Sequence, residues 1–458
     1  MGNKLSILDK AYVGILLVIF GGIVLHAPLS VGFSTLWPDY SLFIKSWKEV
    51  LLGAALLLSV IVLTVRKSWG ILRSRLIYLI AAFAVVNLAL IPVFYTGFDA
   101  TVAGLFIDLR FFLFFVLVYV AIRLYPQLSG LFLRVFIGGA LVVVVFGALQ
   151  LTVLPHDVLK HIGYNETTIM PYLTVDQNYG YVRINSTLRG PNPLGAYAAI
   201  VLAVVVAFVL MRQRVLSVLQ KTILWVLGVG SALALWASYS RSAALAALAA
   251  VGIILLVTQG KRITKGIWVG VVLAILVLGG SLVALRDTQF VSQVILHADP
   301  EEGSPKNSTD EHADSLVDGT ERMLRQPLGG GIGSTGSASL LSDEPLIIEN
   351  QYLFVAHESG WVGLGLFLAI SYFVLLGLWR RRAQWLALAM FASGVGLAIA
   401  CLFLPIWVDE TVSIVWWGLA AVVLAGPVTS KRNTRVAKSA TKKSPQAIGR
   451  KASAGKKS

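Results

Sequence analysis

The sequence predicts an all-α integral membrane protein with about twelve transmembrane helices, both ends in the cytoplasm and two large loops on the outer side. Three observations lead to this prediction. Apolar residues make up 57% of the 458 and charged residues only 13%, about half the charged share of a soluble domain. The mean hydropathy is +0.79. Continuous apolar runs of about 20 residues recur along the chain, the length that a helix needs to cross a bilayer.

These observations exclude a soluble enzyme, a disordered scaffold and a disulfide-stabilised secreted module. They also exclude an outer-membrane β-barrel, because the apolar runs are continuous and do not alternate with polar residues. The single cysteine, Cys401, lies inside an apolar run, so no intrachain disulfide is expected. No small-residue cleavage pattern follows the first apolar run, which favours a retained span over a removed signal peptide.

Twelve apolar segments are the expected spans. They lie near 11–28, 48–65, 76–96, 102–124, 134–154, 193–211, 222–238, 243–259, 266–285, 358–378, 384–404 and 411–427. The chain is thereby divided into blocks of membrane helices, two outer loops and a tail. In order, these are 1–154 (helices), 155–192 (first outer loop), 193–285 (helices), 286–357 (large acidic outer loop), 358–427 (helices) and 428–458 (basic cytoplasmic tail).

Basic residues gather on one side of these spans. They occupy the connections 66–75, 212–221, 261–265 and 380–382, and the tail has ten Lys or Arg and no acid from residue 431 onward. The positive-inside rule places these segments in the cytoplasm. The 286–357 loop has twelve acids against four bases, which suits the outer side. The tail either contacts anionic membrane lipids or is disordered, and nucleic-acid binding has no support beyond the net charge.

The first outer loop ends in two arginines that precede a helix start. Arg183 and Arg189 come before Gly190-Pro-Asn192-Pro, a turn suited to a helix N-terminus, where free N–H groups and the helix dipole favour an anion. Guanidinium groups bind phosphate through paired hydrogen bonds. The two arginines and Asn192 therefore form a candidate diphosphate site. The alternative is that the arginines contact lipid headgroups.

Charged residues occur at two further places, one in a short connection between spans and one inside a span. Arg241 lies in Ser240-Arg241-Ser242, a very short outer connection, where it needs a partner. That partner is either an anionic ligand or the lipid interface, reached by snorkelling. Asp108 and Arg110 lie two residues apart in the fourth span, a spacing at which helical side chains do not face each other. We expect each of them to pair with a structural partner elsewhere.

The end of the large outer loop gathers glycines, carboxylates and a histidine at the membrane boundary. The segments are, in order, Pro327-Leu-Gly-Gly-Gly-Ile-Gly333, Glu349-Asn350-Gln-Tyr352-Leu and His357-Glu358-Ser-Gly360-Trp-Val-Gly363. Such groups suit a general base for an acceptor hydroxyl. The His-Glu spacing matches no metal-binding motif, and the sequence has no Gly-rich nucleotide-phosphate loop. A group transfer on the outer side therefore has to use a donor that arrives already activated, with no metal or cofactor expected.

Taken in order, these segments resemble the O-antigen ligase and polymerase superfamily, the Wzy_C type of multispanning saccharide transferases. The resemblance covers about residues 180–370. It implies a GT-C-like fold in the bacterial cytoplasmic (inner) membrane. It also implies a metal-free, inverting transfer of a saccharide from undecaprenyl diphosphate. The acceptor would be lipid A core, a glycan or another surface acceptor.

The resemblance also implies roles for individual residues. Arg183 and Arg241 would bind the diphosphate, with Arg189 as a third candidate, and Asn192, Asn350 and Tyr352 would contact the substrate. At the position of the base, where ligases commonly have histidine, this chain has Glu349. A glutamate is a weak base at neutral pH unless its site is desolvated. Either Glu349 is a tuned base, or it orients the acceptor while another residue such as His357 or His312 takes the proton.

Two other classes of protein compete with the transferase. A secondary transporter or flippase often has twelve spans with both ends inside, but it places charges and broken helices near the bilayer midplane. Here the expected midplanes are nearly free of charge and the polar residues gather in outer loops. An assembly protein would need no paired arginines at the outer boundary. The sequence therefore favours a ligase-like transferase, with a polymerase of the same superfamily as the alternative, which the glutamate at the base position favours slightly.

Overall fold

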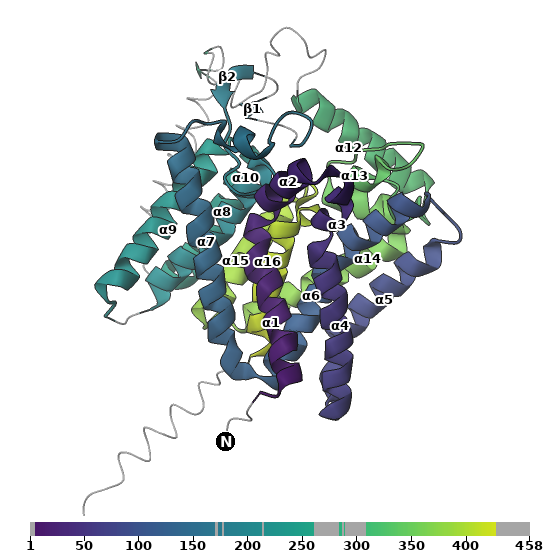
Figure 1. Cartoon of the computed structure of the whole chain (residues 1–458), viewed down its shortest axis with the longest axis horizontal. Coiled ribbons are helices and arrows are strands. Elements are labelled where there is room, and N and C mark those ends of the chain that lie inside the picture. The colour runs from purple at the N-terminus through teal and green to yellow at the C-terminus, as the bar shows by residue number, and fades with distance from the viewer. Residues whose placement is uncertain are drawn as a thin grey trace, which may run out of the picture.

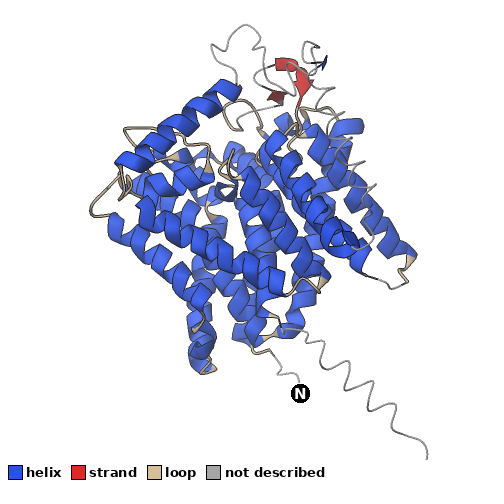
Figure 2. Ribbon diagram, turned by 180° about the vertical axis from the view of Figure 1, so that it is seen from behind, coloured by secondary structure: helices blue, strands red, loops and turns tan. Residues whose placement is uncertain are grey.

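The computed structural model describes residues 5–169, 173–175, 178–212, 215–260, 284–285, 288 and 308–426. Within these residues the protein is helical apart from one short antiparallel hairpin of β1 (Thr174–Val175) and β2 (Asn178–Val182), as Figure 2 shows. The helices before the hairpin are α1 (Ile7–Gly22), α2 (His26–Leu36), α3 (Ser41–Lys45), α4 (Trp47–Val65), α5 (Arg75–Leu90), α6 (Phe98–Leu124) and α7 (Ser129–Thr152). Those after it are α8 (Pro191–Met211), α9 (Val218–Ala237), α10 (Arg241–Gln259), α12 (Ser308–Arg325), α13 (Gly336–Ser339), α14 (Gln351–Arg380), α15 (Trp385–Ala400) and α16 (Glu410–Ala425).

Eight helical stretches are long and apolar enough to cross a membrane. They are Ile7–Leu36, Trp47–Val65, Phe98–Leu124, Pro126–Thr152, Pro191–Met211, Val218–Ala237, Arg241–Gln259 and Gln351–Arg380. Three shorter apolar helices, α5, α15 and α16, match further predicted spans. The protein is therefore a multi-pass membrane protein, as predicted. The predicted span 266–285 lies outside the described residues except for its last two, 284–285. The short hairpin was not part of the all-α prediction.

Helix α16 occupies the middle of the bundle, with α1 in front of it in Figure 1, and it packs along α6 and α15. Every residue of α16 is buried, as expected for a helix that is apolar on all sides. At the middle of α16, Trp417 packs against Phe112 of α6 with ring centroids 4.9 Å apart, and Trp416 packs against Trp417 with centroids 5.2 Å apart. This packing fixes the start of α16, and with it two acidic residues, inside the molecule.

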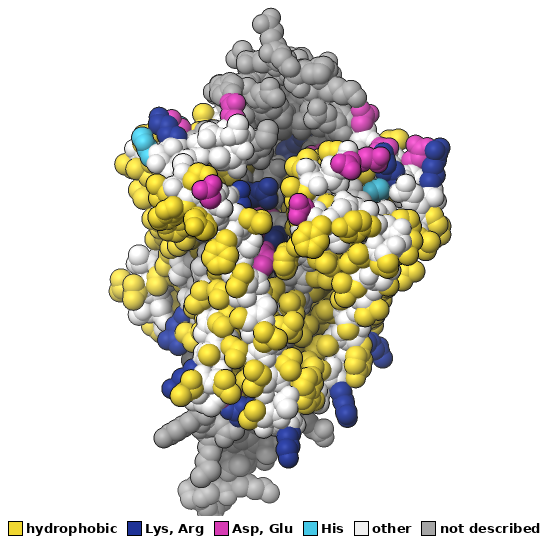
Figure 3. Space-filling view, turned by 45° about the vertical axis from the view of Figure 1, so that its right-hand side comes forward, with side chains coloured by type: hydrophobic (Ala, Val, Ile, Leu, Met, Phe, Trp, Pro, Cys, Tyr) yellow, Lys and Arg dark blue, Asp and Glu magenta, His cyan; other side chains and the backbone are white. Residues whose placement is uncertain are grey.

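The two ends of the bundle differ. The hairpin, α12 and α13 lie at one end, named the loop end here, and the N-terminus lies at the opposite end (Figure 1). In Figure 3 the visible acidic side chains lie in the half that includes the loop end. The charged side chains visible at the opposite end are basic. The same view shows a hollow at the loop end with Lys or Arg side chains inside it.

Candidate functional site

A cavity of about 350 Å³ opens at the loop end, and it is named the central cavity here. Three segments far apart in the sequence form its walls: the start of α8, the stretch from α13 into α14, and the turn before α16. Arg189 and Asn192 line it from the first segment and Asp409 from the third, while Phe354 and Ile348 supply apolar surface. A cavity with apolar walls and a few convergent polar groups is typical of a ligand site.

The α8 side of the central cavity has the chemistry predicted for an anion site. Gly190 precedes α8 in extended conformation, and Pro191 and Pro193 occupy the first turn, where a missing N–H costs nothing. Arg189 is exposed beside this helix start and Asn192 is half-buried. The structure thus brings two of the predicted residues to the cavity wall, next to a helix N-terminus.

Arg183 lies behind this wall. Its buried guanidinium donates from Nε to the Ser238 carbonyl oxygen at 2.8 Å and from Nη2 to Asn192 Oδ1 at 2.7 Å. These bonds join the first outer loop to the end of α9 and the start of α8. In this structure Arg183 orients Asn192, and direct contact of Arg183 with a diphosphate stays a prediction.

Arg241 begins α10 directly beside the first turn of α8. Gly195 of α8 approaches this connection so closely that an added Cβ would lie 2.8 Å from Ser238 Oγ and 3.1 Å from Ser240 Cβ. Arg241 itself is exposed. The short Ser-Arg-Ser connection therefore presents its arginine at the loop end, near the same helix start as Arg189.

Asp409 forms the opposite wall of the central cavity and was not singled out from the sequence. It caps α16 by accepting a hydrogen bond from the Val412 N–H at 2.9 Å. Burial, reinforced by the neighbouring Glu410 charge, raises the pKa of Asp409 to about 6, although the Val412 bond and Arg189 act in the opposite direction. A carboxyl that titrates near neutral pH is suited to general base catalysis.

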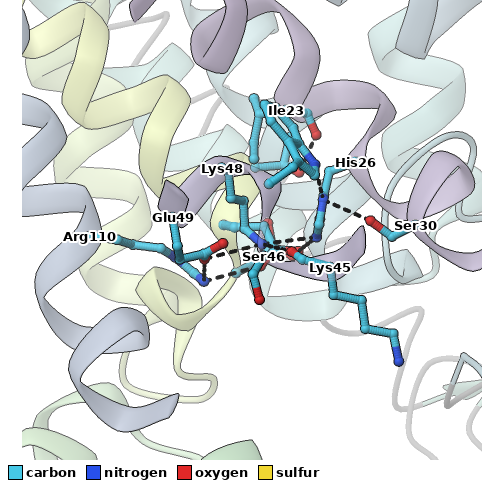
Figure 4. A network of polar contacts seen from close by, with 12 residues as sticks. Ile23, His26, Ser30, Lys45, Ser46, Lys48, Glu49 and Arg110 are labelled. Atoms are coloured by element: carbon cyan, nitrogen blue, oxygen red, sulfur yellow. Dashed lines mark hydrogen bonds and ion pairs between the residues drawn. The ribbon is translucent and has the colours of Figure 1, made fainter. Parts of the chain in front are cut away.

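The residue after Asp409 turns away from the cavity into a buried charge network, shown in part in Figure 4. Glu410 Oε1 lies 3.0 Å from His26 Nε2, and Glu410 Oε2 lies 3.2 Å from Arg110 Nη1 and 3.8 Å from Lys48 Nζ. Glu49 Oε1 lies 3.2 Å from Lys48 Nζ. The network joins α2, α4, α6 and α16, and it confirms that Arg110 has structural partners.

Asp108 lies next to Glu358 of α14, and the two carboxyl groups are close enough to interact. Glu358 Oε1 also accepts from the Gly333 N–H at 3.0 Å, and the Glu358 carbonyl oxygen accepts from the Gly331 N–H at 3.1 Å. The glycine turn and the Glu358 motif, separate in sequence, therefore form one structural unit.

A break in α14 makes this unit possible. Gly360 has φ +63° inside the helix, and an added Cβ there would lie 2.4 Å from the Pro327 carbonyl oxygen. Only glycine fits such a conformation and such a close approach. His357 is buried against the same turn, where its carbonyl oxygen accepts from the Gly330 N–H. It lies in the wall of this unit and is not among the residues that line the central cavity.

The residues predicted around the base position mainly make hydrogen bonds that support the fold. Asn350 caps α14, accepting from the Tyr352 and Leu353 N–H groups, and donates to the Leu402 carbonyl oxygen at 2.9 Å. The Tyr352 hydroxyl donates to the Ala398 carbonyl oxygen at 2.7 Å. Glu349 is half-buried, and its N–H donates to Ser315 of α12 at 3.3 Å. Ile348, and not Glu349, faces the central cavity.

No group of three or more His, Cys, Asp or Glu side chains with the arrangement of a metal site occurs in the described part of the chain. The cavity wall thus brings Arg189, Asn192 and Asp409 together at the end of a multi-pass helical bundle. This arrangement is suited to an anionic group beside an apolar wall.

Comparison with protein families agrees with this class. Residues 226–368 match the family model described as O-antigen ligase (Wzy_C). The match includes the connection at Arg241, the glycine turn at Pro327 and the Glu349-to-Gly363 segment, and it begins after Arg189. No curated protein matches the chain.

Proposed function

We propose that the protein transfers a saccharide from an undecaprenyl-diphosphate-linked donor to an acceptor hydroxyl on the outer face of the bacterial cytoplasmic membrane. The coarser statement, membrane glycosyl transfer of the O-antigen ligase or polymerase type, follows from the family match. The observation that carries the finer proposal is the central cavity, in which Arg189 and Asp409 lie on opposite walls. One wall suits a diphosphate and the other suits a base.

In this proposal the loop end faces outward and both chain ends lie in the cytoplasm. The distribution of charge supports this orientation, because the end opposite the loop end carries basic side chains (Figure 3) and basic residues remain on the cytoplasmic side. No nucleotide supply exists on the outer face. A lipid diphosphate meets this condition because its glycosyl bond is already activated.

The reaction is a single displacement at the anomeric carbon. The acceptor oxygen forms a bond to that carbon while the bond to the diphosphate oxygen breaks, with inversion, and the electron pair leaves with the diphosphate. The acceptor proton passes to the Asp409 carboxylate. Arg189, Arg241 and the N-terminus of α8 stabilise the charge that develops on the leaving group, which is the main task of such a site.

Asp409 replaces Glu349 as the favoured base in this proposal. Asp409 lines the cavity and its pKa of about 6 leaves it ionised at neutral pH. Glu349 follows the cavity-lining Ile348 and contacts α12 through its backbone. Glu349 then helps to hold α12 against the start of α14, which Asn350 and Tyr352 fix to neighbouring turns.

The test is mass spectrometry of undecaprenyl-linked saccharides in cells that lack the gene, complemented with the wild type, Arg189→Ala, Asp409→Asn or Glu349→Gln. We expect the wild type and Glu349→Gln to clear the accumulated pool, and the other two variants to leave most of it. If Glu349→Gln were the only variant that failed to clear the pool, the base would be Glu349 and not Asp409.

The length of the accumulated saccharide separates the two activities within the family. A carrier with a single repeat unit indicates a polymerase, because units are made and not joined. A carrier with long chains indicates a ligase acting on lipid A core or another surface acceptor. An unchanged lipid-linked pool would contradict both activities and favour transport.

A further inference from the structure

A second cavity, named the loop cavity here, lies in the first outer loop. Its volume is about 990 Å³, and it is formed by residues 155–167 together with Leu173 and Val182. This volume is at the upper end of the range for small-molecule sites, about 300–1,000 Å³. The central cavity is about 350 Å³, so the loop cavity has room for a much larger ligand.

The walls of the loop cavity are folded. Leu159, Tyr164 and Ile169 form a small buried core with Val31 of α2. Thr168 and Thr167 are bonded to Asn165, whose Oδ1 accepts from the Thr167 N–H at 2.9 Å. The described stretch 158–169 of the first outer loop therefore has a small core of its own, which fixes one wall of the cavity.

The lining groups have the chemistry that saccharide hydroxyls require. The polar lining residues supply both donors and acceptors; they are His156, Asp157, Lys160, Asn165, Glu166 and Thr167. Lys160 Nζ donates to Asp157 Oδ2 at 2.6 Å, and this bond lowers the pKa of the Asp157 carboxyl. The pair carries no net charge and offers both kinds of hydrogen-bonding group at one edge. Glu166 also lines the cavity, so the lining has one more acid than base and does not favour an anionic ligand.

Two structural links connect the loop cavity to the central cavity. Val182 lines the loop cavity, and the next residue, Arg183, bonds to Asn192, which lines the central cavity. The fully buried Gln150 donates to the His156 carbonyl oxygen at 2.7 Å and accepts from the Ser186 N–H at 3.0 Å. These bonds hold the first outer loop, and with it the loop cavity, against the start of α8 that lines the central cavity.

We propose that the loop cavity binds the outer repeat units of a saccharide chain whose reacting unit lies in the central cavity. This inference rests on the proposed function. The bound chain belongs either to the lipid-linked donor or to the acceptor, since both present the same hydroxyl groups. A site for units beyond the reacting one makes transfer depend on chain length.

The test compares donors of different length with the full-length protein in lipid nanodiscs. The donors are undecaprenyl-diphosphate saccharides with one or with several repeat units, and the acceptor is varied in length in the same way. The variant is the double substitution Asp157→Ala with Lys160→Ala. Its control is Asp318→Ala with Arg322→Ala, which removes another exposed pair, 2.8 Å apart, from α12. Exposed pairs contribute little to stability, so both variants are expected to fold.

We expect the Asp157/Lys160 variant to raise KM for the long substrate about tenfold, the effect of losing one or two hydrogen bonds, and to leave KM for the single-unit substrate unchanged. The substrate whose KM responds, donor or acceptor, identifies the chain that occupies the cavity. An equal change for short and long substrates, no change, or the same change in the α12 control would overturn the inference.

A binding measurement separates this inference from the proposed function. The probe is the saccharide released by mild acid from the lipid-linked pool, which has lost both diphosphate and lipid. If the wild type transfers no donor, the proposed function fails. Calorimetric binding of this probe, weakened in the Asp157/Lys160 variant and not in the control, would still support the loop cavity, and its absence would overturn it.

Discussion

Asp409 and Glu410 are adjacent acids at the start of one helix, yet they belong to two different regions. Asp409 lines the central cavity, as does the exposed Arg189, whose positive charge acts on the Asp409 carboxyl. Glu410 faces the buried network, where His26, Lys48 and Arg110 surround it. A buried carboxylate with several cationic partners is held ionised and fixed. One with a raised pKa and access to a cavity is free to exchange a proton.

The comparison assigns stability to one acid and chemistry to the other. The network joins α2, α4, α6 and α16 below the cavity, so it positions the turn on which Asp409 lies. Arg110 contributes directly, because its Nη2 donates to the Val408 carbonyl oxygen at 2.5 Å. Substitutions at the two neighbouring positions are therefore expected to fail in different ways.

The largest effect is expected from Glu410→Gln. Removing this charge leaves Lys48 and Arg110 with Glu49 alone, and breaking a buried ion pair costs about 3–5 kcal/mol. We expect the variant to show a strongly lowered unfolding temperature in detergent and a reduced amount in the membrane. Glu344→Ala, an exposed acid of the large outer loop, is the control. A Glu410→Gln protein as stable as the wild type would show that the network does not support the fold.

The second effect concerns Asp409→Asn, which should fold normally. Asparagine caps a helix as well as aspartate does, so the bond to Val412 is retained and only the ionisable group is lost. We expect the transfer rate to fall by about 10²–10⁴, the usual contribution of a general base. Glu349→Gln serves as the comparison, with little change in rate. Equal rates for Asp409→Asn and the wild type would remove Asp409 from the chemistry.

A third effect follows from the raised pKa of Asp409, about 6. The base works in its ionised form, so activity is present above this pKa and is lost as the pH falls through it. We expect kcat/KM to be roughly tenfold lower at pH 5 than at its upper plateau. Rates measured from pH 5 to pH 8 check this. A flat profile over this range in the wild type would contradict Asp409 as the base.

Sequence patterns predicted a bundle of apolar helices and the helix start beside Arg189, because both depend on local order along the chain. Runs of apolar residues define spans, and Arg189 and Asn192 lie where a helix start was expected. The position of Asp409 depends on the meeting of α8, α14 and α16, which no local pattern encodes. Two acids in a short connection between the last two predicted spans were the available signal, and an acid before an apolar run is equally typical of a simple helix cap.

The same reasoning explains the residues whose surroundings differ from expectation. Arg110 donates to the carbonyl oxygen of Val408, which lies 298 positions away in the chain. The sequence therefore predicted that Arg110 has a structural partner, but it did not identify that partner. Asn350 and Tyr352 belong to a motif predicted to contact substrate, and in the structure their side chains hold the start of α14 to neighbouring turns. A motif records which residues occur together, and it does not separate contact with substrate from support of the fold.

The smallest effect tests this supporting role. Asn350→Ala removes the cap of α14 and the bond to the Leu402 carbonyl oxygen, and loss of a cap costs about 0.5–2 kcal/mol. We expect a modest decrease in unfolding temperature with the KM for the donor unchanged. Asn350→Asp keeps the cap acceptor while removing the amide donor, and should recover most of the loss. A large increase in KM at wild-type stability would instead place Asn350 in contact with the substrate, and α14 would then begin at the reaction centre itself.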